Sequence, residues 1–122
     1  MNFDDAIKAH SSWKGKIAAY LERPDQSIDA TSLELDNQCA LGKWIHGEGK
    51  VAFGADATFK NLKLEHAKFH REAAALVKRA NGGEKVAAEA TLGGDSAYAK
   101  QSARVVGLIV DMKRKAVVAP VR

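Results

Sequence analysis

Three of the four histidines lie where a helix would turn them toward a protein core. His66 and His70 are four residues apart, so on a helix their imidazoles share one face, one turn from each other. His10 falls on a second apolar stripe, together with Ile7 and Trp13. Because a buried imidazole without a partner costs roughly 1–3 kcal/mol, three of them in one short chain indicate a shared partner such as a metal ion.

The single cysteine, Cys39, lies at the start of a short predicted helix, and a helix N-terminus favours the thiolate over the thiol. Three imidazoles and one thiolate form a closed tetrahedral set that suits zinc best among the common metals. The residue types and their spacing therefore predict one Zn²⁺ ion held by His10, Cys39, His66 and His70.

Each of these residues alone also permits a plainer interpretation. His10 fits a hydrogen-bonded core histidine, the His66/His70 pair fits two surface residues, and Cys39 fits a small buried hydrophobe. The fourth histidine, His46, stands at the end of the short helix; we interpret it as a surface residue, with an auxiliary ligand as the alternative.

Length and composition exclude several classes of protein. The chain has 122 residues, of which 46% are hydrophobic and 28% charged, which is typical of one globular domain over residues 1–122. The net charge of +4 is mild and acids alternate with bases, so no nucleic-acid partner is indicated. Apolar runs are too short for a membrane span. A single cysteine and an N-terminus without a signal-peptide pattern predict a cytoplasmic protein.

Helical periodicity dominates the chain and predicts an all-α fold. The expected helices cover residues 3 to about 23, about 37–45, 56–80 and 96 to about 119, with one further turn near 84–90 and another within the loop 26–35. The short helix is followed by Gly47-Glu48-Gly49, and Asp56 is the expected N-cap of the next helix. That helix has an inward stripe of Phe59, Leu62, His66, Phe69, His70, Ala73, Leu76 and Val77. We expect an antiparallel four-helix-type bundle with a short extra helix carrying Cys39. Antiparallel packing of the first long helix against the second would bring His10 opposite His66 and His70. The last helix is apolar around much of its circumference, which predicts a homodimer.

The same residues resemble a known family, the chemoreceptor zinc-binding domain, CZB. The matching elements are His10 with Trp13-Lys14, the segment Cys39-Ala-Leu-Gly-Lys-Trp44, and His66-Ala-Lys-Phe-His70. The resemblance implies a helical bundle that binds one zinc ion through His10, Cys39, His66 and His70. It also implies a role in bacterial signal transduction, in chemotaxis or cyclic-di-GMP control, with a chemoreceptor or a diguanylate cyclase as partner. Relatives usually carry an attached signalling domain, so this chain is expected to be a stand-alone member or one excised domain.

Two functions that use the same atoms stay open. One is a zinc-sensing regulatory domain, whose zinc affinity should fall as pH drops through the histidine range. The other is a redox sensor in which an oxidant such as hypochlorous acid attacks the zinc-bound thiolate of Cys39.

An enzyme is disfavoured, because four protein ligands leave no open position on the metal and Ala67 stands where His-Glu-x-x-His has its glutamate. A di-iron oxygen carrier is disfavoured too, because it would need bridging carboxylates and more histidines than the four in this chain. Three acidic residues, Asp36, Glu65 and Glu72, are near the ligands in sequence, but the sequence assigns them no role.

Overall fold

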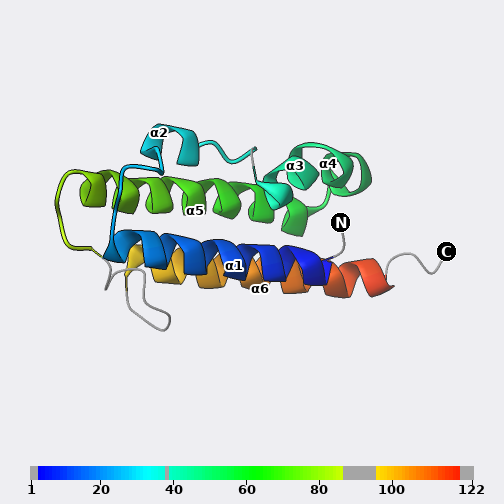
Figure 1. The fold of residues 1–122 in the computed structure, drawn as a ribbon. Coiled ribbons are helices and arrows are strands. Elements are labelled where there is room, and N and C mark those ends of the chain that lie inside the picture. The colour runs from blue at the N-terminus through cyan, green and yellow to red at the C-terminus, as the bar shows by residue number, and fades with distance from the viewer. Residues whose placement is uncertain (1–2, 38, 87–95, 119–122) are drawn as a thin grey trace.

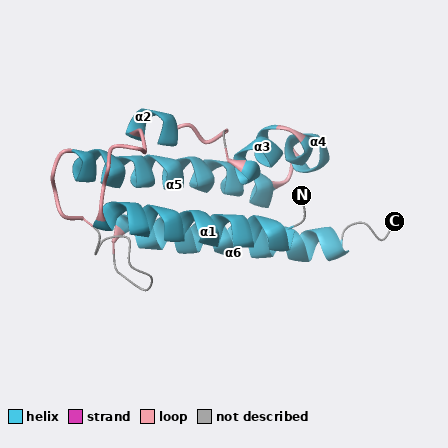
Figure 2. Ribbon diagram, viewed as in Figure 1, coloured by secondary structure: helices cyan, strands magenta, loops and turns pink. Residues whose placement is uncertain are grey.

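The computed structural model describes residues 3–37, 39–86 and 96–118, with side chains up to residue 115. In this part of the chain the structure contains six helices and no strand, so the predicted all-α fold is confirmed. The helices are α1 (Phe3–Glu22), α2 (Ala30–Leu33), α3 (Ala40–His46), α4 (Glu48–Phe53), α5 (Ala57–Asn81) and α6 (Ala97–Val118). Figures 1 and 2 show the long helices α1, α5 and α6 packed side by side, with the three short helices along α5. None of the described helices is both long and apolar enough to cross a membrane.

The direction of the long helices differs from the expectation in one respect. Lys113 at the end of α6 pairs with Asp4 at the start of α1 (2.7 Å), so α6 runs antiparallel to α1. In contrast, Tyr20 near the end of α1 donates a hydrogen bond to Asn81 at the end of α5 (2.6 Å). Helices α1 and α5 are therefore parallel to each other (Figure 1), and the expected antiparallel packing of the first long helix against the second is wrong.

Parallel neighbours need a connection that returns to the starting end, and residues 23–56 provide it by running back along α5 (Figure 1). This segment holds α2, the single turn expected within residues 26–35, and α3, the expected short helix. Helix α4 was not expected, because Gly47 and Gly49 indicated a break. Gly49 instead permits close packing, since a Cβ there would lie 2.8 Å from the ring of Trp44. The turn predicted near 84–90 lies mostly outside the described residues, and residues 84–86 are not helical.

Helix α5 is the central element. Its N-terminus is capped by Asp56, whose side chain accepts a hydrogen bond from the amide of Phe59 (3.0 Å), as the sequence predicts. The predicted stripe of α5 is buried throughout: Phe59, Leu62, His66, Phe69, His70, Ala73, Leu76 and Val77. An apolar core thus surrounds two imidazoles, and these two polar side chains need partners inside it.

Candidate metal centre

The two histidines of α5 lie in contact in the interior. Their exposed fractions are 1% for His66 and 2% for His70. The ring centroids are 4.6 Å apart and the two Nε2 atoms are 3.2 Å apart. The four-residue spacing therefore gives a paired imidazole face, as the helical geometry requires.

Cys39 reaches this pair from the returning segment. It is the N-cap residue of α3, and its Sγ accepts a hydrogen bond from the amide of Gly42 (3.3 Å). The chain passes so closely here that a Cβ on Gly42 would collide with the carbonyl oxygen of Asp36. Trp44 anchors α3 by edge-to-face contacts with Phe3 of α1 and Phe59 of α5, at ring-centroid distances of 5.4 Å and 5.8 Å. The glycine and the tryptophan of the Cys-Ala-Leu-Gly-Lys-Trp segment thus serve to place the sulfur.

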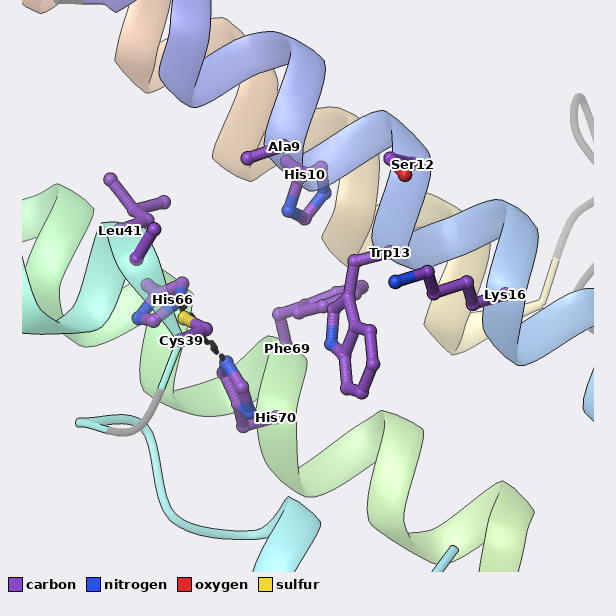
Figure 3. A pocket seen from close by; sticks show the side chains of 11 residues that line it. Ala9, His10, Ser12, Trp13, Lys16, Cys39, Leu41, His66, Phe69 and His70 are labelled. Carbon is purple, nitrogen blue, oxygen red and sulfur yellow. Dashed lines mark hydrogen bonds between the residues drawn. The ribbon is translucent and has the colours of Figure 1, made fainter. Parts of the chain in front are cut away.

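The sulfur and the two imidazole nitrogens form a triangle. The Sγ of Cys39 lies 3.3 Å from Nε2 of His66 and 3.5 Å from Nε2 of His70. A tetrahedral zinc ion with ordinary bond lengths would hold two nitrogens about 3.4 Å apart and a nitrogen and a sulfur about 3.6 Å apart. The triangle has the size that one zinc ion requires, and Figure 3 shows the three side chains directed toward one another.

The ring orientation of His70 is fixed by a backbone group. Its Nδ1–H donates to the carbonyl oxygen of Leu33 at the end of α2 (2.8 Å). Because a neutral imidazole has one N–H, this bond leaves the Nε2 lone pair of His70 directed at the triangle. In His66, by contrast, the Nδ1 atom is buried and has no hydrogen-bond partner among the described residues.

His10 faces the triangle from α1, across a pocket of about 260 Å³ that all four predicted ligands line (Figure 3). Its ring packs against Phe69 at 4.5 Å and is only 5% exposed. Its Nε2 atom bonds to Ser102 Oγ of α6 at 2.9 Å. The structure therefore brings Cys39, His66 and His70 into one group, with His10 nearby but outside it.

The chemoreceptor zinc-binding domain family matches residues 10–77, which is more than half of the chain. The chain belongs to the CZB family. The resemblance carried by the histidine and cysteine motifs is confirmed. Neither a curated protein nor a solved structure matches the chain. CZB domains are zinc-binding signalling domains, and the donor set of Cys39, His66 and His70 fits that metal in type and spacing.

Burial favours the neutral form of three imidazoles of this CZB domain, those of His10, His66 and His70. It lowers the pKa of His66 from 6.5 to about 3, with a smaller contribution from His70. Burial, followed by the charges of Lys14 and His70, lowers the pKa of His10 to about 4. The pKa of His70 is lowered by burial as well. Neutral imidazoles have free lone pairs, so the histidines need not lose protons to bind a metal at neutral pH.

The pKa of Cys39 is shifted upward, whereas those of the three buried histidines are shifted downward. Burial raises the pKa of its thiol and outweighs the amides of Gly42 and Leu41, which favour the thiolate. The expectation that the helix N-terminus favours a thiolate is therefore wrong for the protein alone, although a bound cation would reverse it. The expected loss of zinc affinity in the histidine range also needs correction. The pKa values of the three buried histidines are lowered, so Cys39 is the predicted ligand that would have to lose a proton to bind zinc at neutral pH.

The remaining candidates lie outside the triangle of this CZB domain. His46 is an exposed residue at the end of α3 and pairs with Asp36 (3.3 Å), as the surface interpretation expects. Glu65 pairs with Arg104 (3.2 Å) instead of a ligand. Sequence reasoning missed the two groups that do bond to the histidines, the Leu33 carbonyl and Ser102. A backbone carbonyl and a lone serine in a helix have no sequence signature.

The buried neutral histidines make the chelator-treated protein sensitive to acid. The unfolded chain takes up protons near pH 6.5, whereas folded His10 and His66 do so only near pH 4 and 3. The contribution of these two histidines to the free energy of unfolding is therefore fully present above pH 6.5. Below that pH it falls by about 1.4 kcal/mol per pH unit for each residue. We expect the two to cost on the order of 5 kcal/mol by pH 4.5, measured by urea unfolding.

The variant His10→Ala should lose about half of this contribution from His10 and His66. Equal pH dependence in His10→Ala and the parent protein would contradict a neutral buried His10.

Proposed function

We propose that this protein is a zinc-responsive regulatory domain whose ion is held by His10, Cys39, His66 and His70. The observation that carries the proposal is the triangle of Cys39, His66 and His70, whose edges of 3.2–3.5 Å match those of a tetrahedral zinc site. His10, buried on the opposite wall of the same pocket, is the fourth ligand. The bound ion would keep Cys39 as a thiolate and join α1, α5 and the returning segment.

A regulatory role follows from the elements that these ligands link. Structural zinc sites contribute about 10–16 kcal/mol of apparent binding free energy at pH 7. That free energy can change how α1 and the Cys39 segment pack on α5, provided that the signalling states differ in zinc affinity. Four protein ligands leave no position for a substrate, so we assign no catalytic activity to the site.

The ligand set is tested by zinc analysis of single variants. Cys39→Ala, His66→Ala and His70→Ala should each lower zinc affinity by roughly 100- to 1000-fold, because four ligands share the binding free energy. His10→Ala should lower it as well. His46→Ala is the matched control, since it removes an imidazole outside the group. Parent-like zinc content in the Cys39→Ala and His70→Ala variants would refute the assignment.

The family supports a signalling context. We propose that residues 1–122 form a single CZB domain that acts in the cytoplasm, on a chemoreceptor in chemotaxis or on a diguanylate cyclase in cyclic-di-GMP control. Either partner would respond to a change in how the helices of the bundle pack, because the zinc site itself is enclosed by α1, α3 and α5.

We further propose a homodimer that forms through the outer face of α6. Ala103 and Gly107 are exposed there, with Val106 and Val110 half-buried beside them. Gly107 is informative, because a Cβ at this position would meet nothing within 4 Å. A glycine inside a helix costs roughly 0.5–1 kcal/mol relative to alanine, and close approach of a second copy would explain its presence.

The dimer is tested by replacing this glycine with a longer side chain. Gly107→Gln should leave the monomer fold intact and weaken dimerisation at least about tenfold, since the new side chain overpacks the interface. Sedimentation velocity measures the equilibrium, and Lys78→Gln on exposed α5 surface is the control. A monomeric parent protein, or a variant that dimerises as the parent does, would contradict this interface.

An oxidant sensor is the second candidate function, and the position of Cys39 favours it. The residue is half-buried and lines two adjoining pockets, so a small oxidant has a path to the sulfur. Hypochlorous acid would transfer its oxygen to the thiolate. A sulfur–oxygen bond forms, the oxygen–chlorine bond breaks, sulfur loses two electrons, and chloride leaves with the sulfenic acid as the other product. The site would then lose its thiolate ligand.

Zinc release under oxidation tests this function. Hypochlorous acid at modest excess should release zinc from the loaded protein and give a trappable sulfenic acid at Cys39. A thiol reductant should restore both the thiol and zinc binding, because sulfenic acids are reversible. Retention of zinc with a reduced Cys39 would contradict the redox function and leave the zinc-responsive one standing.

A further inference from the structure

The bond between His10 and Ser102 joins two helices that are far apart in sequence. The residues are 92 positions apart, and the distance from His10 Nε2 to Ser102 Oγ is 2.9 Å. Both side chains are buried, with exposed fractions of 5% and 0%. Ser102 also lies outside residues 10–77, the part of the chain that the family matches.

Two partners require the same nitrogen of His10. His66 and His70 both direct Nε2 at the sulfur of Cys39. Nε2 is the imidazole nitrogen farther from the backbone, and so the better placed of the two to reach across the pocket. In the structure this atom is bonded to α6 and His10 lies outside the three-residue group. To ligate the ion through Nε2, the ring must leave Ser102.

We infer that Ser102 is a positioning residue that competes with the metal for His10, so that zinc binding replaces an α1–α6 hydrogen bond by an α1–metal bond. This inference rests on the proposed role of His10 as the fourth ligand. Ser102 then lowers the zinc affinity. It also makes α6 respond to metal occupancy, because its buried hydroxyl has a different hydrogen-bond partner in the zinc-free and the zinc-bound protein.

The surroundings of Ser102 suit such an exchange. A serine in a helix can turn its hydroxyl to the carbonyl four residues earlier, here that of Tyr98, so Ser102 has a second partner available when His10 leaves. Its neighbour Gln101 donates a hydrogen bond to the carbonyl of Glu65 (2.8 Å), directly before His66. One turn of α6 therefore contacts both α1 and the metal-binding turn of α5.

Ser102→Ala tests the competition. Without the hydroxyl, zinc affinity measured against a competing chelator should rise by about 2- to 10-fold, the effect of one lost neutral hydrogen bond. Ser102→Thr keeps the hydroxyl and should retain the parent affinity. Ser11→Ala, at an exposed serine of α1, is the matched control and should change nothing.

A double-mutant cycle separates this inference from the proposed ligand set. In a His10→Ala background, Ser102→Ala should no longer alter zinc affinity. If His10→Ala alone leaves the affinity unchanged, the four-ligand proposal fails. If His10→Ala weakens binding but Ser102→Ala in the parent background weakens it or has no effect, the competition is refuted and the ligand set stands.

Nuclear magnetic resonance of the imidazole nitrogens gives a readout independent of affinity. Ser102→Ala should shift the His10 Nε2 resonance in the chelator-treated protein, and the resonances of variant and parent should converge after zinc is added. A difference between the two that persists with zinc bound would overturn the exchange.

Discussion

Three electron-rich atoms, the Sγ of Cys39 and the Nε2 atoms of His66 and His70, lie within 3.5 Å of one another in the interior. Protons alone cannot satisfy all three contacts. His70 uses its one N–H on the Leu33 carbonyl, so the thiol and His66 have two hydrogens for three edges. One edge is left without a hydrogen bond, which is costly for polar atoms in the interior. A divalent cation would satisfy all three edges at once, which is the physical reason that this donor set fits a metal ion.

The rest of the fold follows from bringing these atoms together. Because α1 and α5 are parallel, a long segment must return along α5, and that segment carries the sulfur. Its position depends on a glycine that permits contact with the Asp36 carbonyl and on Trp44, which packs between α1 and α5. The helices α2 to α4 are short and bury few apolar side chains of their own. A metal ion held by Cys39 would thus add stability where the apolar core provides least.

The sequence predicted the parts of this structure that local rules govern. The spacing of His66 and His70, the cap at Asp56 and the helical turn within residues 26–35 all depend on neighbours within four residues. Helix direction does not, because an apolar stripe is the same in a parallel and in an antiparallel pair. The expected thiolate was wrong for a similar reason: amides near Cys39 are visible in the sequence, whereas the burial that outweighs them depends on the whole fold.

Helix α6 offers a route by which the proposed metal site could act on a partner. With four protein ligands the proposed site would have no position for a substrate, so its signal would be a change in how the helices pack. Helix α6 contacts both α1 and α5, and its C-terminal end is tied to them by ion pairs of Lys113 with Asp4 and Lys115 with Asp56. Exposed pairs of this kind contribute about 0–1 kcal/mol each. The exchange of the Ser102 hydrogen bond that we infer is of the same order as these ion pairs, so metal occupancy can compete with them in setting the position of α6.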